Sequence, residues 1–341
     1  MAIYLYGQYA HPSGSNLPVV MLLPGISQQA TDFEQVTLER IAAYGVFACS
    51  VSMRHRNYSG GTQDCSARET YDIYDILAYI RANFASVVDA DYAAIAGYSG
   101  GGGNALNAAC KFPDTWAVVV SCFGISDYGV DAIDGWYDNG ALAGDQTLMD
   151  AWIGGNPAAV PDAYRARNAA EGIASNYTAG HLYLFHDDQD ARVPVVNSEN
   201  VGAAMLAAGL ANYTESYTTL IDNPRWLHNL PNGAQPIIQT EPVWAAAVAA
   251  KTHAVWTVPA NTTHRVIGYI KTKRYECWLG TTTKAGAGGG LDEVADVLYG
   301  VIPNEYTVTP LTGACDVYIE QADGKTGTAS GITEATPITV S

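Results

Sequence analysis

The segment YAAIAGYSGGGGNALNAACKF places a serine and four glycines between a strand-like run and a helical one. Residues 92–98 form the apolar, strand-like run, and residues 102–112 have the spacing of a helix. The pattern G-x-S-x-G, residues 97–101, therefore falls on a strand-to-helix turn. Only small neighbours let the strand, the serine and the helix approach so closely at such a turn. The segment predicts a sharp turn that presents Ser99 at the start of a helix.

Other interpretations of the glycine run fit the sequence less well. A flexible linker is disfavoured because apolar, periodic segments flank the glycines on both sides. A P-loop needs Lys followed by Ser or Thr after the glycines, and GGGGNAL has neither. A dinucleotide fingerprint would place its first strand–glycine turn near the N-terminus. The chain has 34 glycines, so the flanking strand and helix carry the interpretation more than the pattern does.

The first 250 or so residues alternate short β-rich runs with helical patterns, which predicts an α/β fold with a mostly parallel, doubly wound sheet. The run LPVVMLLPG, residues 17–25, is continuously apolar, as in a strand buried on both faces. We expect further strands within residues 46–53, 92–98, 116–124, 181–187 and 213–220, and helices within residues 32–45, 67–84, 102–112, 197–209 and 236–251.

Two regions depart from this alternation. Residues 125–180 are rich in Gly, Asp and aromatic residues and are too long for a simple connection, so we expect a cap inserted over the site. Residues 251–341 are rich in Thr, Val, Tyr and Ile, with alternation and no long helix. The sequence thus predicts a catalytic domain over residues 1–250 and a separate β-rich module over residues 251–341.

Charge and composition disfavour several classes of protein. The 34 acidic and 17 basic residues give a net charge of -17, which repels nucleic-acid phosphates and anionic membranes. No apolar run is long enough for a membrane span, and the N-terminus lacks signal-peptide features, so we expect a cytoplasmic protein. The six cysteines form no CxxC pair, and we expect neither a metal nor an organic cofactor.

A nucleophilic serine needs a base and an acid that orients the base. At turns of this kind the chain order is Ser, then Asp or Glu, then His. The segment LYLFHDDQDARVPVVNSENV offers Asp187, Asp188 and Asp190 just after a strand, and we favour Asp190 because it lies deepest in the loop, with Asp188 as the alternative. The loop after the next strand contains His228. Both loops follow strands, where an open α/β sheet builds its site.

The remaining histidines fit the role of base less well. His181 and His186 precede the acid in the chain, which is the wrong order. His253 and His264 fall at or beyond the expected domain junction, and His55 lies in a loop that could contact substrate. A lone histidine is more often structural than catalytic, so the choice of base depends on order and setting.

The negative charge that develops beside the serine needs two hydrogen-bond donors. The backbone N–H of Gly100, at the start of the helix, supplies one. The loop LLPGISQQ supplies the other, for which we expect the N–H of Ile26, although Pro24-Gly25 could equally form an ordinary turn. Four aromatic residues are candidates for the substrate pocket, and aromatics in a cap serve as often in packing as in recognition: Tyr98, Trp136, Tyr137 and Trp152.

Several segments together resemble an α/β-hydrolase domain, closest to the prolyl-oligopeptidase-like serine esterases and peptidases. They are VVMLLPG, RNYSGGTQD with the following YDIYDILAYIRAN, AGYSGGG, WIGGNPAAVPDAYRARNA and LFHDDQDARVPVVNSENV. They cover most of residues 15–230, and the resemblance extends to about residue 250. The last segment matches the acid loop of the family, which places Asp190 at the position of the catalytic acid.

The chain departs from this family at two functional positions. The family has His-Gly in the oxyanion loop, where this chain has Pro24-Gly25. The family has Gly-His-Gly around the catalytic histidine, where this chain has Leu227-His228-Asn229. The β-propeller that restricts many of the peptidases to small peptides has no counterpart in this sequence. We therefore expect an esterase rather than an oligopeptidase.

The Thr-, Val- and Tyr-rich strands and the Gly-, Thr- and Ser-rich tail of residues 251–341 are similar to β-domains of bacteriophage tail and capsid appendage proteins. This similarity implies attachment, oligomerisation or glycan binding, with virion proteins as partners and a phage virion as the final location.

From these features we expect a serine hydrolase that cleaves esters of short acyl groups, with acylated surface glycans among its substrates. Ser99 is the nucleophile, His228 the base and Asp190 the acid. The alternatives are a structural or receptor-binding virion protein with a hydrolase-like domain, and a serine peptidase that acts on small peptides.

Overall fold

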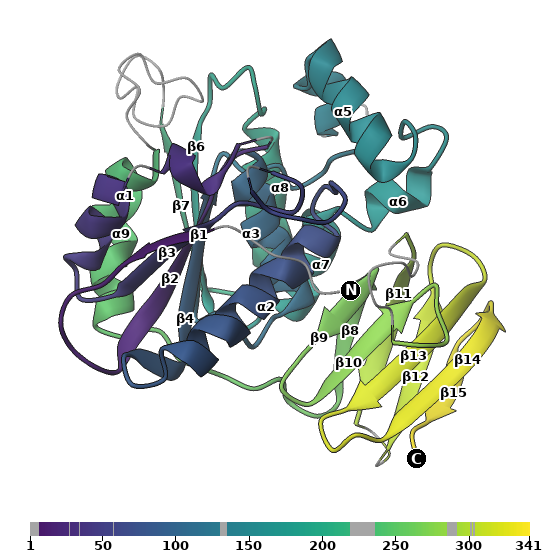
Figure 1. Ribbon diagram of the computed structural model, residues 1–341. Helices are drawn as coiled ribbons and strands as arrows, with labels where there is room; N and C mark the ends of the chain where they lie inside the picture. The colour runs from purple at the N-terminus through teal and green to yellow at the C-terminus, as the bar shows by residue number, and fades with distance from the viewer. Residues whose placement is uncertain are drawn as a thin grey trace.

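A mostly parallel sheet is the central element of the first 250 residues (Figure 1). The computed structural model describes residues 7–26, 28–33, 35–56, 58–129, 135–218, 236–284, 292–300, 302 and 304–341. Within them the strand order is β1-β3-β2-β4-β5-β6-β7, and only the β1–β3 pair is antiparallel. The strands are β1 (Gly7–Ala10), β2 (Leu17–Leu23), β3 (Phe47–Val51), β4 (Val88–Tyr98), β5 (Val118–Cys122), β6 (His181–Asp187) and β7 (Tyr213–Thr218).

Strand β2 shows that this sheet is covered on both faces. Val19, Met21 and Leu23 pack in one apolar cluster, and the alternating Val20 and Leu22 pack in another. Helices α1 and α9 cover one face, and α2, α3 and α8 cover the other (Figure 1). Their bounds are α1 (Gln35–Ala42), α2 (Arg68–Asn83), α3 (Gly100–Lys111), α8 (Val196–Ala207) and α9 (Pro236–Ala249), with a short 3-10 helix, η1 (Ala30–Asp32). The predicted α/β fold class, with a doubly wound sheet, is confirmed.

The insertion between β5 and β6 contains four described helices, of which three form a projection beside the sheet (Figure 1). The helices are α4 (Trp136–Asn139), α5 (Ala143–Ile153), α6 (Pro161–Arg165) and α7 (Ala169–Asn176). Trp136, Met149 and Tyr164 of the first three helices pack in one apolar cluster with residues of neighbouring loops, such as Cys65 and Val193. Helix α7 instead packs against α3 and α8, so the insertion returns to the helical layer before β6 begins.

The C-terminal region forms an antiparallel sheet with the strand order β14-β13-β10-β9-β8-β11-β12-β15. Its strands are β8 (Thr262–Ile267), β9 (Tyr269–Lys271), β10 (Tyr275–Leu279), β11 (Val294–Tyr299), β12 (Glu305–Pro310), β13 (Cys315–Gln321), β14 (Thr326–Ile332) and β15 (Thr336–Thr339). Thr326 and Ser341 exchange two backbone hydrogen bonds of 3.3 and 3.1 Å, so the two edges of the sheet meet. The sheet thereby curls around an apolar interior. No helix within the described residues is long and apolar enough to cross a membrane.

The second sheet packs directly against helices of the first domain. Tyr269 and Trp278 belong to the same apolar cluster as residues of α2 and α3. The phenol oxygen of Tyr269 lies 2.6 Å from Oγ1 of Thr70, and Asn176 exchanges two hydrogen bonds with the backbone of Arg265, each of 2.8 to 2.9 Å. The two sheets therefore share part of their core, while the division into domains near residue 250 stays a prediction.

Lys111, the last residue of α3, is fully buried at the contact between the two sheets. Its ammonium group donates to the carbonyl oxygens of Ala166, at 3.1 Å, and of Ile267, and it lies 4.8 Å from the ring centre of Tyr269. Burial, together with the smaller effect of the nearby charge of Arg167, lowers the pKa of Lys111 to about 7. The proton on Lys111 is therefore bound more weakly in the folded chain than in the unfolded one.

This pKa makes the stability of the fold depend on pH. In the unfolded chain Lys111 has an ordinary lysine pKa of about 10.4. Between pH 7 and pH 10 this residue therefore binds more protons in the unfolded chain than in the folded one. The free energy of unfolding should therefore rise with pH, by about 1.4 kcal/mol per pH unit at most from this group. In Lys111→Met this contribution is lost, so urea titrations from pH 7 to pH 9 should show a flatter rise than in the wild type. Parallel curves for the two proteins would contradict this assignment.

Candidate active site

Ser99 occupies the turn between β4 and α3, as the sequence predicts. Its backbone has φ 55° and ψ -127°, a conformation that costs energy in a residue with a side chain. The turn is fixed on both sides, because Ser99 N–H donates to Cys122 at 3.0 Å and its carbonyl oxygen accepts from Gly103 at 3.0 Å. A strained, well-held serine at a helix N-terminus is the geometry of a nucleophile turn, and in this structure Ser99 is 6 % exposed. Its role in catalysis stays a prediction.

The glycines around Ser99 are required by the close approach of backbone segments. A Cβ atom on Gly97 would overlap the carbonyl of Gly101, and one on Gly101 would overlap the carbonyls at the end of β2. A Cβ on Gly102 would lie 2.7 Å from Cα of Gly124, and one on Gly103 would lie 2.5 Å from the carbonyl oxygen of Ile125. Helix α3 thus begins against the ends of both neighbouring strands.

The two expected oxyanion donors lie on adjacent backbone segments. A Cβ atom added to Gly100 would lie only 2.7 Å from the backbone nitrogen of Ile26. The loop that carries Ile26 is held by Gln28, whose side-chain oxygen accepts from Gly25 N–H at 2.9 Å and from the Tyr98 hydroxyl at 2.7 Å. Burial raises the pKa of the Tyr98 phenol, which keeps its proton available for this bond. In this structure the buried Tyr98 supports the oxyanion loop.

Asp190 lies in the loop after β6 and is almost fully buried. Its Oδ1 accepts hydrogen bonds from the backbone N–H groups of Arg192, at 2.8 Å, and Val193, at 3.0 Å. These two bonds fix the plane of the carboxylate, as an acid that orients a histidine requires. Asp188, the alternative acid, is exposed.

His228, the expected base, lies outside the described residues, so its assignment stays a prediction. His186 is close to the acid but has a structural environment, since it is completely buried. Its Nε2 lies 2.8 Å from the carbonyl oxygen of Val193 and therefore carries a hydrogen. Its Nδ1 lies 2.7 Å from Oγ of Ser198. His186 thus joins the acid loop to α8.

The cap holds the acid loop through Arg192, a residue that the sequence analysis did not single out. The guanidinium group of Arg192 pairs with Asp145 of the cap at 2.6 Å and donates to the carbonyl oxygen of Gly140 at 3.2 Å. In return, Nε1 of Trp136 donates to the carbonyl oxygen of Arg192 at 2.7 Å. Trp136, predicted to line the pocket, is only 1 % exposed and connects the cap to the loop that carries Asp190. The one sequence signal for this linking role of Arg192 is its position two residues after Asp190.

Tyr137 and Trp152, the other two pocket candidates, are half-buried and pack with Ile26 against the apolar cluster of the cap. Tyr137 donates its hydroxyl hydrogen to Asp150 at 2.9 Å. The guanidinium carbon of Arg56 lies 5.4 Å from the centre of the Trp152 ring. The contact of either ring with substrate stays a prediction.

A buried polar network connects α3 to the loop after β3. Glu69 accepts from Arg56 at 2.6 Å and from the amide of Asn104, in α3, at 3.0 Å. Burial raises the pKa of Glu69 to about 7, and the charge of Arg56 opposes this rise. The network thus connects Glu69, a carboxyl group on α2 with a raised pKa, to Asn104, which lies in α3 about one helical turn beyond Ser99.

The comparisons with known proteins agree with this geometry. Residues 52–220 match the model of the prolyl oligopeptidase family. The resemblance to prolyl-oligopeptidase-like α/β-hydrolases is confirmed. No curated protein matches the chain. The proposed similarity of residues 251–341 to bacteriophage appendage domains stays a prediction.

Solved α/β-hydrolase structures are similar to this chain at low sequence identity. Pyrococcus horikoshii acylaminoacyl peptidase has 20 % identity and a TM-score of 0.51, with 63 % of this chain and 34 % of that chain covered. An esterase of Pyrococcus furiosus has 16 % identity and a TM-score of 0.52, with 74 % and 88 % covered. Thermogutta terrifontis esterase 2, phosphonylated by sarin, has 15 % identity and a TM-score of 0.53, with 73 % and 91 % covered. The chain thus spans about a third of the peptidase and most of each esterase.

The contact between Gly100 and Ile26 gives a test of the oxyanion site. In Gly100→Ala the added methyl group should push the loop of Ile26 away and separate the two donors. We expect hydrolysis of p-nitrophenyl acetate to slow by about 10²-fold or more, as for the loss of an oxyanion donor. The control is Gly144→Ala in α5, where a Cβ atom would meet nothing within 4 Å. Equal activity in the two variants would contradict the assignment.

The connection between the cap and the acid loop gives a second test. Arg192→Met keeps the length of the side chain but removes its bonds to Asp145 and Gly140. We expect kcat to fall by about 10-fold to 100-fold with little change in KM, because the acid loop is displaced while the substrate surface remains. Lys284→Met, which removes an ion pair of 3.1 Å with Glu320 in the second sheet, is the control. An effect on KM alone would show that Arg192 contacts substrate rather than positions the acid.

Proposed function

We propose that this protein is a serine hydrolase that cleaves carboxylic esters of short acyl groups through an acyl-enzyme. The observation that carries the proposal is the strained backbone of Ser99 at the N-terminus of α3, beside the backbone nitrogen of Ile26. Such a turn places the hydroxyl group where backbone N–H groups can stabilise a developing oxyanion. The match of residues 52–220 to the prolyl oligopeptidase family supports the same reaction class.

In the proposed mechanism Ser99 Oγ attacks the ester carbonyl while His228 accepts its proton. The carboxylate of Asp190, oriented by two backbone N–H groups, holds the imidazole of His228 and stabilises its positive charge. The N–H groups of Gly100 and Ile26 bind the oxyanion. His228 then returns the proton to the leaving alcohol, and water, activated by the same base, releases the acid and regenerates Ser99.

The esterase assignment is supported by the extent of the structural matches and by the cap. The esterases match over 88 % and 91 % of their chains, whereas the acylaminoacyl peptidase matches over 34 %. Ile26, Tyr137 and Trp152 all pack against the apolar cluster of the insertion, and we infer that they offer apolar and aromatic surface to a short acyl group. Acetylated polysaccharides are therefore the first natural substrates to test.

Cleavage of short peptides is the second candidate, because the matched family and one of the similar structures are peptidases. The esterase and peptidase functions are distinguished by measuring turnover of a panel of acetyl to octanoyl esters, acetylated polysaccharides and short peptides. We expect turnover of short esters and none of the peptides. If the protein cleaved peptides with a kcat/KM comparable to that for the short esters, the peptidase assignment would replace the esterase assignment.

The catalytic group is tested by substitution. We expect Ser99→Ala, His228→Gln and Asp190→Asn each to lower kcat by about 10³-fold to 10⁴-fold or more, because the three act as one unit. Asp188→Asn, at the exposed neighbouring acid, should leave kcat unchanged. Labelling of Ser99 by a fluorophosphonate should occur in the wild type and fail in Ser99→Ala. A wild-type protein that neither labels nor hydrolyses any ester would instead favour a binding role for a hydrolase-like domain.

A further inference from the structure

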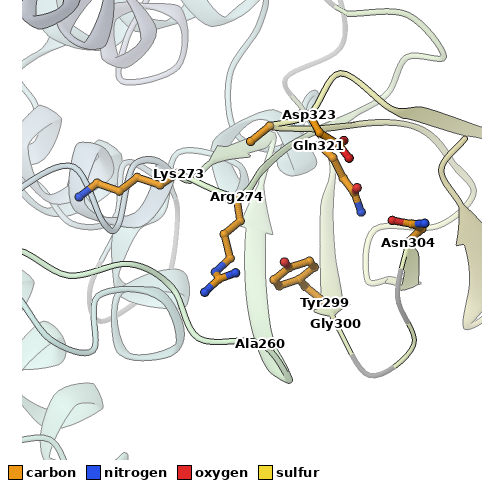
Figure 2. A pocket seen from close by; sticks show the side chains of 9 residues that line it. Ala260, Lys273, Arg274, Tyr299, Gly300, Asn304, Gln321 and Asp323 are labelled. Carbon is orange, nitrogen blue, oxygen red and sulfur yellow. The ribbon is translucent and has the colours of Figure 1, made fainter.

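A cavity lined by both polar and apolar groups lies at one end of the antiparallel sheet (Figure 2). Its volume is about 470 Å³, within the range of about 300–1,000 Å³ that is usual for small-molecule sites. It is formed where strands begin or end, between the segments before β8, β10 and β12 and those after β11 and β13. Its lining residues are Ala260, Lys273, Arg274, Tyr299, Gly300, Asn304, Gln321, Ala322 and Asp323.

The position of this cavity separates it from the proposed active site. The backbone N–H of Lys273 donates to both carboxylate oxygens of Asp114 at 3.1 Å. Asp114 follows the C-terminal end of α3, whereas Ser99 precedes its N-terminal end. The 12 residues of α3 span about 18 Å, so one rigid helix separates the two sites.

Arg274 and Asn304 are held by main-chain hydrogen bonds at the rim of the cavity. Arg274 donates its N–H to Thr272 at 3.1 Å, and its carbonyl oxygen accepts from Ala322 at 2.9 Å. The carbonyl oxygen of Asn304 accepts from Val340 at 2.9 Å. Figure 2 shows Arg274, Asn304 and the aromatic ring beside them around the hollow, with the side chain of Lys273 turned away from it. Groups fixed in this way can bind a ligand with little loss of conformational freedom.

Two of these side chains have hydrogen-bonding capacity that the described part of the chain does not use. Nε of Arg274 donates to the carbonyl oxygen of Val258 at 2.7 Å, which fixes the guanidinium plane. Its two terminal nitrogens, and the side-chain amide of Asn304, have no hydrogen-bond partner among the described residues. Together they offer a donor fork and an amide that both donates and accepts. Water satisfies them until a ligand with matching groups replaces it.

Tyr299 supplies an aromatic wall whose orientation is also fixed. Its ring lies 5.3 Å from that of Tyr306, in a stacked arrangement, and 5.1 Å from that of Tyr275. The adjacent Gly300 has φ 87°, a conformation that disfavours a side chain, and a Cβ atom there would lie 3.1 Å from Ala260. Because Gly300 has no side chain, the cavity is not narrowed beside the Tyr299 ring. A fixed aromatic face can stack against the C–H face of a sugar ring.

We propose that this cavity is a saccharide-binding site, separate from the hydrolase centre. Asp323, which also pairs with Lys325 at 2.8 Å, contributes a carboxylate to the lining. A polyanion is disfavoured because the chain carries a net charge of -17. Sugar hydroxyls both donate and accept hydrogen bonds, so they match the guanidinium, amide and carboxylate groups together. The aromatic face adds a contact that a phosphate or a simple carboxylate could not use. The inference goes beyond the proposed ester hydrolysis and does not depend on it.

Binding is tested with unacylated oligosaccharides, which contain no ester that the hydrolase site could cleave. The full chain is applied to an array of neutral and uronate-containing oligosaccharides, and the strongest binder is titrated by calorimetry. We expect saturable binding that is at least tenfold weaker in Arg274→Ala and in Asn304→Gly. Glycine suits position 304, because Asn304 has φ 61°. Preference for uronates over neutral sugars would show that the Arg274 fork holds a carboxylate of the saccharide.

The controls distinguish this site from general charge effects and from the hydrolase site. Lys284→Ala removes a cation from the same sheet outside the cavity and should leave the affinity unchanged. Ser99→Ala should also bind normally, and Arg274→Ala should keep its melting temperature and any ester hydrolysis. Absence of binding to every oligosaccharide would overturn the proposal. So would binding that survives both cavity substitutions or weakens equally in Lys284→Ala.

Discussion

The contact of α3 with the ends of β2 and β5 is the constraint on which the rest of the structure depends. Gly97 and Gly101 allow the strand before Ser99 and the helix after it to meet without a side chain between them. The same approach brings Gly100 next to the backbone nitrogen of Ile26, so one packing contact forms both the turn at Ser99 and the pair of backbone segments proposed as the oxyanion site. Any side chain in this contact would disturb both of these features, which explains why glycine is required where a helix would otherwise favour alanine.

The main features of the fold could be predicted from local sequence patterns because those patterns record local physical requirements. A short, continuously apolar run that ends at Pro-Gly favours a strand covered on both faces, and β2 is one. The turn at Ser99 is determined by glycines adjacent to it in the chain. Asp190 follows its strand directly and takes its two hydrogen bonds from Arg192 and Val193, which are also local. In each case the interacting groups are close in the sequence.

The features that the sequence did not reveal depend on groups that are distant in the chain. The sequence predicts that Trp136 lines the substrate pocket, but in the structure its indole N–H donates to the carbonyl oxygen of Arg192, 56 residues later in the chain. Lys111 reads as an ordinary basic residue at a helix end, but its ammonium group is buried between Ala166 and Ile267. Neither partner can be identified from spacing, because a backbone carbonyl has no sequence signature. For the same reason, the contact of the second sheet with the helices of the first domain could not be predicted from the sequence.

The second sheet therefore contributes to the geometry of the hydrolase site. Helix α3 is held at its N-terminal end by the glycine contacts and at its C-terminal end by Lys111, which donates to carbonyls of the insertion and of β8. Asp114, just beyond the helix, accepts backbone hydrogens from Val258 and Lys273 of the C-terminal region. A helix fixed at both ends cannot shift along its axis without breaking buried polar contacts at one of them. The antiparallel sheet thus acts as a support for the helix that carries the nucleophile turn, and it fixes the distance between that turn and the polar cavity beside Lys273.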